Sequence, residues 1–148
     1  GKKYGQQKGE WAYSQIPFRL MIEPVFEGLH EIKLFCFDGK CELVRYMPPR
    51  TDFDRHPSER MGECYLLPDG TRLDIKTKAN RAYRGEICVD IPDIVKAEKE
   101  TKGIDHVRLD LYWNEDLYFG EFTFYSGSGV MQWEDEQTDK WLGKFWKL

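Results

Sequence analysis

The stretches VRLDLYW at 107–113 and LYFGEFTFY at 117–125 predict two β-strands, because both alternate apolar and polar residues with the two-residue period of a strand. Only Asn114-Glu115-Asp116 separates them, so together they predict an antiparallel hairpin. The alternation gives this hairpin one apolar face and one face of charged and polar side chains. We therefore expect its apolar face to pack on a core and its polar face to be exposed.

Further strands are predicted on the amino-terminal side of this hairpin. The strongest signal is Asp38-Gly39, a dipeptide that favours a tight turn between two β-rich runs. A second turn is expected at Pro68-Asp69-Gly70, and the proline-rich, charged segment 47–60 is expected to be a loop. The predicted strands, all rich in β-branched, aromatic or aliphatic residues, cover 18–22, 31–37, 41–46, 64–67 and 71–75.

Two helices are predicted beside these strands. Residues 93–102 have a helical composition and end before Gly103, a residue suited to the left-handed conformation that follows many helices. Residues 137–148 place Trp141 and Phe145 on one face, where we expect them to pack in the core. Mostly antiparallel strands with flanking helices make an α+β fold, and 148 residues suffice for a single domain, 1–148.

Composition narrows the class of protein. The net charge of -4 and the absence of a dense run of Lys or Arg argue against nucleic-acid binding. No stretch has the length and apolarity of a transmembrane helix, and the first residues lack the apolar core of a signal peptide, so we expect a cytoplasmic protein. The 4 cysteines show no metal-binding spacing and are expected to be reduced and structural.

Asp110 and Glu121 are candidate metal ligands. A hairpin turn of two or four residues would put them on the same face, with Cβ atoms about 5 Å apart if opposite or about 7–8 Å if diagonal, whereas a three-residue turn would separate them. Two carboxylates this close repel each other unless one is protonated or a cation joins them, and Mg²⁺ commonly binds one or two carboxylates with substrate phosphates. Thr123 adds a hydroxyl, and Arg108 on the same face can bind a phosphate.

A simpler interpretation is a solvent-facing strand pair in which Arg108 neutralises the two acids. Charged residues on one face of an amphipathic hairpin are common, and surface ion pairs carry little functional information. Spacing alone slightly favours this simpler interpretation, and it is a resemblance to a known family that favours the metal site.

The triplets Arg108-Leu109-Asp110 and Glu121-Phe122-Thr123, followed by the small-residue loop 126–129, resemble the metal-binding signature of ATP-grasp enzymes. The wider pattern over 107–112 and 118–129 is more similar to the TupA-like branch associated with teichuronopeptide biosynthesis, including Thr where most ATP-grasp enzymes have Asn. The resemblance implies Asp110, Glu121 and Thr123 as ligands of Mg²⁺. It also implies that Arg108 stabilises phosphate charge in the transition state.

The same resemblance implies a nucleotide site. Residues 22–26, Ile-Glu-Pro-Val-Phe, resemble the family's hinge, in which Glu23 precedes an adenine-binding carbonyl of Pro24 and an adenine-binding N–H of Phe26. Glu31 occupies the position of the acid that binds the ribose hydroxyls. Glu23 and Glu31 are equally compatible with ordinary charges at strand ends, and Lys33 is expected to be an exposed strand residue rather than a phosphate ligand.

The resemblance covers most of residues 10–148 and implies the rear, carboxy-terminal part of a larger ATP-grasp domain. The family's phosphate-binding lysine strand and glycine-rich loop are not found in the chain, so we expect an amino-terminal subdomain as a partner. The implied activity is ATP- and Mg²⁺-dependent ligation of a carboxylate to an amine through an acyl phosphate, in the synthesis of a cell-surface polysaccharide or peptide polymer.

Two alternatives remain open. One is a shortened, non-catalytic ATP-grasp relative that serves as a binding or scaffold module beside a glycosyltransferase. The other is an unrelated β-rich carbohydrate-binding domain, which would use exposed Trp and Tyr side chains to stack on sugars and would need neither nucleotide nor metal.

Overall fold

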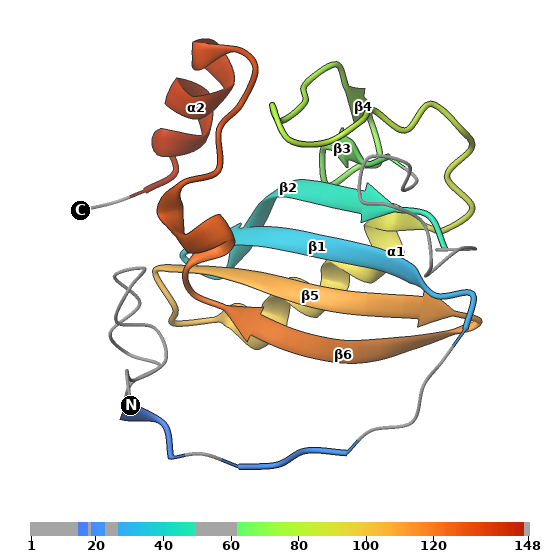
Figure 1. The fold of residues 1–148 in the computed structure, drawn as a ribbon, viewed down its shortest axis with the longest axis vertical. Coiled ribbons are helices and arrows are strands. Elements are labelled where there is room, and N and C mark those ends of the chain that lie inside the picture. Colours follow the sequence, from blue (N-terminus) through green and yellow to red (C-terminus); the bar gives the residue numbers. More distant parts are fainter. Residues whose placement is uncertain (1–14, 18, 23–26, 50–61, 147–148) are drawn as a thin grey trace.

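The fold is a six-stranded antiparallel sheet with short helices on its two faces, in the order β4-β3-β2-β1-β5-β6 (Figure 1). The structure, a computed structural model, describes residues 15–17, 19–22, 27–49 and 62–146. Its strands are β1 (His30–Phe37), β2 (Lys40–Met47), β3 (Cys64–Leu66), β4 (Arg72–Leu73), β5 (His106–Asn114) and β6 (Asp116–Thr123). The predicted α+β fold and its three hairpins are confirmed.

The tight turn between β1 and β2 explains why this hairpin was predictable from the sequence. Asp38 and Gly39 have φ angles of 52° and 77°, the left-handed conformation that a two-residue turn of this kind requires. The β1–β2 hairpin is therefore specified locally, and β5 pairs with the other edge of β1.

The helices begin and end at different residues from those predicted. The first consists of α1 (Ile91–Val95), capped by the Asp90 side chain, and a tighter 3₁₀ segment, η4 (Lys96–Thr101). The carboxy-terminal helix is shorter than predicted, since α2 covers only Glu136–Gly143. Phe145 and Trp146 follow it in a non-helical segment and contact the Phe37 ring, with centroids 5.8 Å and 6.1 Å away. A further short 3₁₀ turn, η5, covers Ser126–Gly129.

The strand predicted at 18–22 is wrong for residues 19–22, which form no strand and leave Leu20, Met21 and Ile22 exposed. β-forming residues adopt a strand when they have a neighbouring strand and a surface to pack on, and the described part of the chain offers this segment neither. Phe18 and most of the predicted loop 47–60 lie outside the described residues.

The two faces of the sheet bury different cores. One face packs on α1 and η4 and carries apolar side chains of the four central strands. The other face, turned toward the viewer in Figure 1, packs on segment 131–133 and α2 through a second cluster. That second cluster comprises Phe35, Phe37, Leu43, Tyr65 and Trp133, with Trp141, Leu142 and Phe145 packed against it. The core role predicted for Trp141 and Phe145 is confirmed, whereas Trp146 is 48% exposed.

Cys36, Cys41 and Cys64 are free and buried within the first of these cores, whereas Cys88 is free and exposed. Among the described residues, no helix has the length and apolarity needed to cross a membrane.

Candidate functional site

A bulge in β6 sets the geometry of the candidate site. The turn after β5 is tight, with Asn114 paired to Asp116 around a single residue, Glu115, whose φ is 61°. An unbroken ladder from this turn would place Gly120 opposite Asp110 and would turn Glu121 to the other face. Instead, the register shifts between Asp110 and Leu111, and Glu121 becomes the direct partner of Asp110.

Gly120 is the extra residue of this bulge, and the close packing around it requires a glycine. A Cβ atom at Gly120 would lie 2.8 Å from the carbonyl oxygen of Asp110 and 2.8 Å from Cε2 of Tyr112. These separations are below normal contact distances, so a larger residue would push the two strands apart. The bulge is therefore what puts two acidic side chains on one face of the hairpin.

Asp110 is the buried centre of a charged network. It is only 1% exposed, and its carboxylate accepts two hydrogen bonds from Arg108, from Nε to Oδ1 at 2.6 Å and from Nη2 to Oδ2 at 2.7 Å. Lys33 of β1, its direct cross-strand partner, donates a third bond from Nζ to Oδ2 at 2.5 Å. The Lys33 ammonium also lies 2.6 Å from Oε1 of Glu31.

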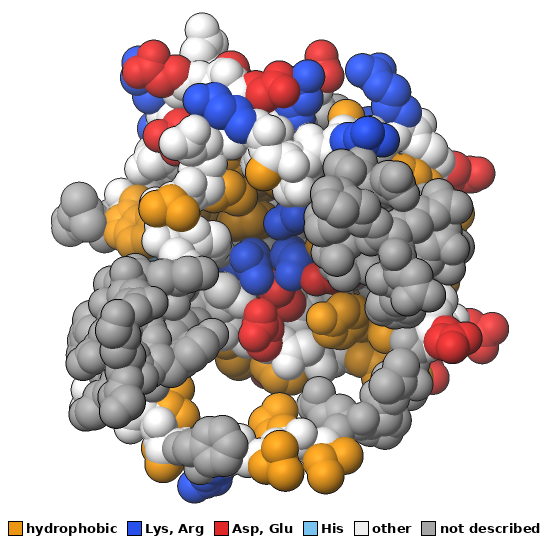
Figure 2. All heavy atoms as spheres, in the orientation of Figure 1, with side chains coloured by type: hydrophobic (Ala, Val, Ile, Leu, Met, Phe, Trp, Pro, Cys, Tyr) orange, Lys and Arg blue, Asp and Glu red, His pale blue; other side chains and the backbone are white. Residues whose placement is uncertain are grey.

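The other end of the network is open to solvent. The side chain of Glu121 is 67% exposed, and its Oε1 accepts a 3.0 Å hydrogen bond from the hydroxyl of Thr123. That hydroxyl accepts in turn from Nη2 of Arg108 at 3.1 Å, while Arg108 and Glu121 are 3.8 Å apart. Figure 2 shows basic and acidic side chains gathered near the middle of this face, beside areas of hydrophobic surface.

The charges in this network determine the protonation of Arg108. Burial alone would lower its pKa, but the hydrogen bond to Asp110 and the negative charges of Asp110, Glu121 and Glu31 raise the pKa above its usual value. Arg108 therefore stays cationic. With three carboxylates and two cations, Lys33 and Arg108, the network has a formal charge of -1.

The donor set fits Mg²⁺ only when a ligand supplies part of the coordination shell. Among the described residues, no group of three or more His, Cys, Asp or Glu side chains could hold a metal ion. Two opposed carboxylates, Asp110 and Glu121, and the adjacent hydroxyl of Thr123 match the smaller share that a protein contributes when Mg²⁺ binds with phosphates. A cation could thus be held here together with a polyphosphate.

The remaining predicted residues are only partly described. Glu31 lies at the start of β1 on the same face as Asp110, joined to it through Lys33. Glu23, Pro24 and Phe26 of the predicted hinge lie outside the described residues.

The expectation that Lys33 is exposed is wrong. Its side chain is 11% exposed because β1 is a central strand, flanked by β2 and β5, and acidic partners on this face cover the ammonium. The two-residue period of a strand puts Lys33 on the same face as Glu31. The sequence contains no signal, however, for the pairing of β1 with β5 that brings Lys33 to Asp110.

Sequence reasoning also missed a second buried carboxylate on this face. Glu63 forms an ion pair with Arg45 and accepts hydrogen bonds from Tyr65 Oη at 2.6 Å, Thr77 Oγ1 at 3.1 Å and Asn80 Nδ2 at 3.0 Å. These residues come from three separate segments without a shared motif, so only the fold brings them together.

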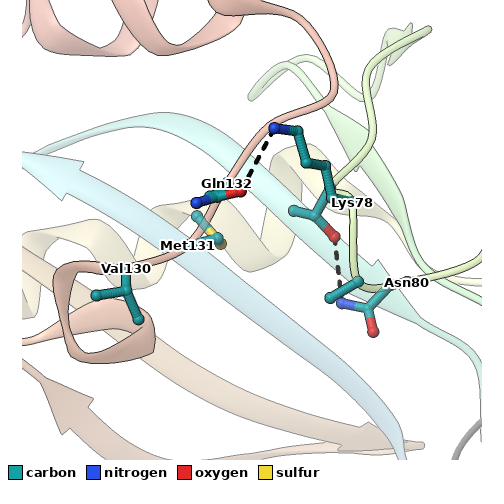
Figure 3. Close-up of a pocket in the computed structure, with 7 residues that line it drawn as sticks. Lys78, Asn80, Val130, Met131 and Gln132 are labelled. Atoms are coloured by element: carbon teal, nitrogen blue, oxygen red, sulfur yellow. Dashed lines mark hydrogen bonds between the residues drawn. The ribbon is translucent and has the colours of Figure 1, made fainter.

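Beside this second network is a shallow cavity of about 300 Å³ (Figure 3). Lys78 spans its rim and donates to Oε1 of Gln132 at 3.4 Å. Its lining residues are Thr77, Lys78, Ala79, Asn80, Val130, Met131 and Gln132. Because none of these is acidic, the cavity is not the predicted metal site.

The chain matches a known protein family. The family described as TupA-like ATPgrasp matches residues 2–147, nearly the whole chain. No curated protein and no solved structure matches it. On the strength of that family match, the chain belongs to the TupA-like ATP-grasp family.

Proposed function

We propose that this chain binds Mg²⁺-ATP as part of a ligase that joins a carboxylate to an amine through an acyl phosphate. The observation that supports this most is the direct opposition of Asp110 and Glu121, with Arg108 and Thr123 on the same face. A structural ion pair would not need a glycine bulge to bring a second, largely exposed acid beside the first. The expected setting is the synthesis of a cell-surface polysaccharide or peptide polymer in the cytoplasm.

Each residue of the network has a role in this proposal. Asp110, Glu121 and Thr123 hold Mg²⁺, which when bound offsets the negative charge of the transferred phosphate. Arg108, already cationic and fixed by Asp110, donates to phosphate oxygens as their charge changes in the transition state. Thr123 orients the carboxylate of Glu121 through its 3.0 Å hydrogen bond.

The nucleotide roles rest on family membership. Glu31 binds the ribose hydroxyls, and Glu23, Pro24 and Phe26 form the adenine-binding hinge just before β1. The proposal treats residues 1–148 as one domain, the rear part of a larger ATP-grasp domain that works with an amino-terminal subdomain of the same family.

A second candidate function is favoured by one specific observation. Asp110 is fully engaged by Lys33 and Arg108, as a purely structural carboxylate would be. If these ion pairs never open, the chain is a non-catalytic ATP-grasp relative that serves as a binding or scaffold module.

Calorimetric titration with ATP, with and without Mg²⁺, tests the proposal. We expect the wild type to bind ATP in a Mg²⁺-dependent way, and Asp110→Asn to weaken that binding by at least about tenfold because a ligand charge is lost. Glu121→Gln provides a second test that is safer for folding, since Glu121 is largely exposed. Asp93→Asn, the same change at an exposed helical site, is the matched control.

The other outcomes assign the chain to the alternatives. ATP binding that ignores Mg²⁺ and Asp110→Asn, or no ATP binding at all, would reject the ligase and favour the scaffold. Binding of a sugar without metal or nucleotide would instead favour a carbohydrate-binding domain.

A further inference from the structure

The Lys33 ammonium bridges the two ends of the proposed site. It lies 2.5 Å from Oδ2 of Asp110, the proposed metal ligand, and 2.6 Å from Oε1 of Glu31, the proposed ribose ligand. The side chains of Lys33 and Asp110 are 11% and 2% exposed. A buried cation therefore joins one acid that is assigned to the metal and another that is assigned to the nucleotide.

Asp110 in this arrangement has both carboxylate oxygens already occupied by cationic donors. Both oxygens accept hydrogen bonds from Arg108, and one also accepts from Lys33. A bare divalent cation that approached Asp110 would meet like charge at short range in a poorly screened place. Glu121, by contrast, is 67% exposed and lies 3.8 Å from one cation, Arg108.

A nucleotide polyphosphate reverses this balance. It carries negative oxygens that can accept from Lys33 and Arg108, and its complex with a divalent cation still has a net negative charge. The lysine stem is flexible and its ammonium has three donors, so Lys33 can release Asp110 and donate to a phosphate. Glu31 can hold the Lys33 ammonium during this exchange, because its Oε1 lies 2.6 Å from Nζ of Lys33.

We infer that Lys33 is a positioning residue that closes Asp110 to free divalent cations and releases it when a nucleotide polyphosphate arrives. This inference rests on the proposed function. It makes metal binding conditional on the nucleotide, and by linkage each of the two raises the affinity for the other by the same factor.

Binding of Mn²⁺, a paramagnetic substitute for Mg²⁺, tests the inference through a readout other than activity. Electron paramagnetic resonance measures Mn²⁺ bound to the protein alone, and calorimetry measures a non-hydrolysable ATP analogue with and without Mn²⁺. For the wild type we expect weak binding of Mn²⁺ alone and analogue binding that Mn²⁺ strengthens by at least about tenfold.

Lys33→Met should change the two affinities in opposite directions. Removal of the ammonium should tighten binding of Mn²⁺ alone by about tenfold, because Asp110 loses a competing cation. It should weaken binding of the Mn²⁺-analogue complex by about tenfold, because a charged phosphate donor is lost. A residue needed only for folding would weaken both. Lys40→Met, the same change at the exposed start of β2, should alter neither.

The outcomes separate the inference from the proposed function. If the wild type binds the Mn²⁺-analogue complex but Lys33→Met leaves the affinity for free Mn²⁺ unchanged or lower, the inference is overturned and the proposed function stands. If the wild type does not bind the complex, the proposed function fails and the inference falls with it. Should Lys33→Met not fold, Glu31→Gln/Lys33→Met removes the opposing charges together, and its affinity for free Mn²⁺ must exceed that of Glu31→Gln.

Discussion

Two buried carboxylates on the same face of the sheet, Asp110 and Glu63, are held in different ways. Among the described residues, Asp110 accepts only from the cations Lys33 and Arg108. Within the same part of the chain, Glu63 forms one ion pair, with Arg45, and accepts its other bonds from three neutral donors. Both acids are almost completely buried, at 1% and 4% exposed, so the difference lies in the partners and not in the depth.

Neutral donors make the Glu63 network permanent. Burial raises the pKa of Tyr65, and the nearby charge of Glu63 raises it further, so the Tyr65 hydroxyl stays protonated and donates. These hydroxyl and amide donors carry no charge that a competing anion would attract, whereas a lysine or arginine can exchange one anion for another. We therefore expect Glu63 to stabilise the fold, whereas the proposed function requires a polyphosphate to displace Lys33 from Asp110.

Glu63→Gln should have the largest effect on stability. It leaves Arg45 buried without its counter-charge and replaces an acceptor by an amide that cannot satisfy every donor, which should cost about 3–5 kcal/mol of unfolding free energy. Urea denaturation monitored by circular dichroism measures this cost. Glu134→Gln, which disrupts a solvent-accessible ion pair with Lys76, should cost at most about 1 kcal/mol.

The same measurement on Asp110→Asn tests whether Asp110 is also structural. Lys33 and Arg108 each keep a second acid nearby, Glu31 and Glu121 respectively, so we expect a smaller loss of stability than for Glu63→Gln. A larger loss for Asp110→Asn would show that Asp110, too, is primarily structural, and it would favour the scaffold function.

Gly120→Ala should have the next largest effect, because it attacks the bulge and leaves every charged residue in place. Its Cβ would lie 2.8 Å from the Asp110 carbonyl oxygen, and the required strand shift should cost about 1–3 kcal/mol. Displacement of Glu121 from Asp110 should also remove Mg²⁺-dependent ATP binding, as measured by calorimetry.

Gly143→Ala is the matched control for this substitution. No atom lies within 4 Å of the added Cβ at the end of α2, so the change should be neutral or should stabilise by up to about 1 kcal/mol. Gly120→Ala protein with wild-type stability and metal-dependent binding would show that the bulge is not needed for the site.

The hairpins were predictable because local signals specify them. Asp38-Gly39 adopts the left-handed turn that its sequence favours, and the alternation along β5 correctly separates the apolar residues from Arg108 and Asp110. The opposition of Asp110 and Glu121 was predictable only as one of several registers. The odd-numbered turn argued against it, and the Gly120 bulge that restores it leaves no local signal beyond a glycine within a strand.

What the sequence could not predict depends on contacts between distant segments. Lys33 reaches Asp110 because β1 pairs with β5 across 77 residues, and Glu63 collects donors from β3 and a later loop. The strand prediction at 19–22 failed for a related reason, since these strand-forming residues have no neighbouring strand among the described residues. Long-range pairing decides these features, and residue type alone does not.

The smallest predicted effect concerns His106, another titratable group on the same face, whose neutral form the fold stabilises. Burial lowers its pKa below 6.5, although its hydrogen bond to the carbonyl of Cys36 opposes the shift. A carbonyl only accepts, so Nδ1 donates in this 3.0 Å contact, and the ring packs against Phe37 and Trp146. Protonation would place an uncompensated charge among aromatic rings, in contrast to the paired charge of Asp110.

The sign of the pH dependence follows from the depressed pKa of His106. Between this pKa and 6.5 the unfolded chain binds the proton more readily than the folded one, so stability should fall as the pH drops from about 7 toward 5.5. His106→Asn keeps a side-chain donor for the Cys36 carbonyl and should make this fall shallower. It should not abolish it, because burial also lowers the pKa of His30. Equal slopes for wild type and variant, in urea denaturation across this range, would show that His106 is not kept neutral by the fold.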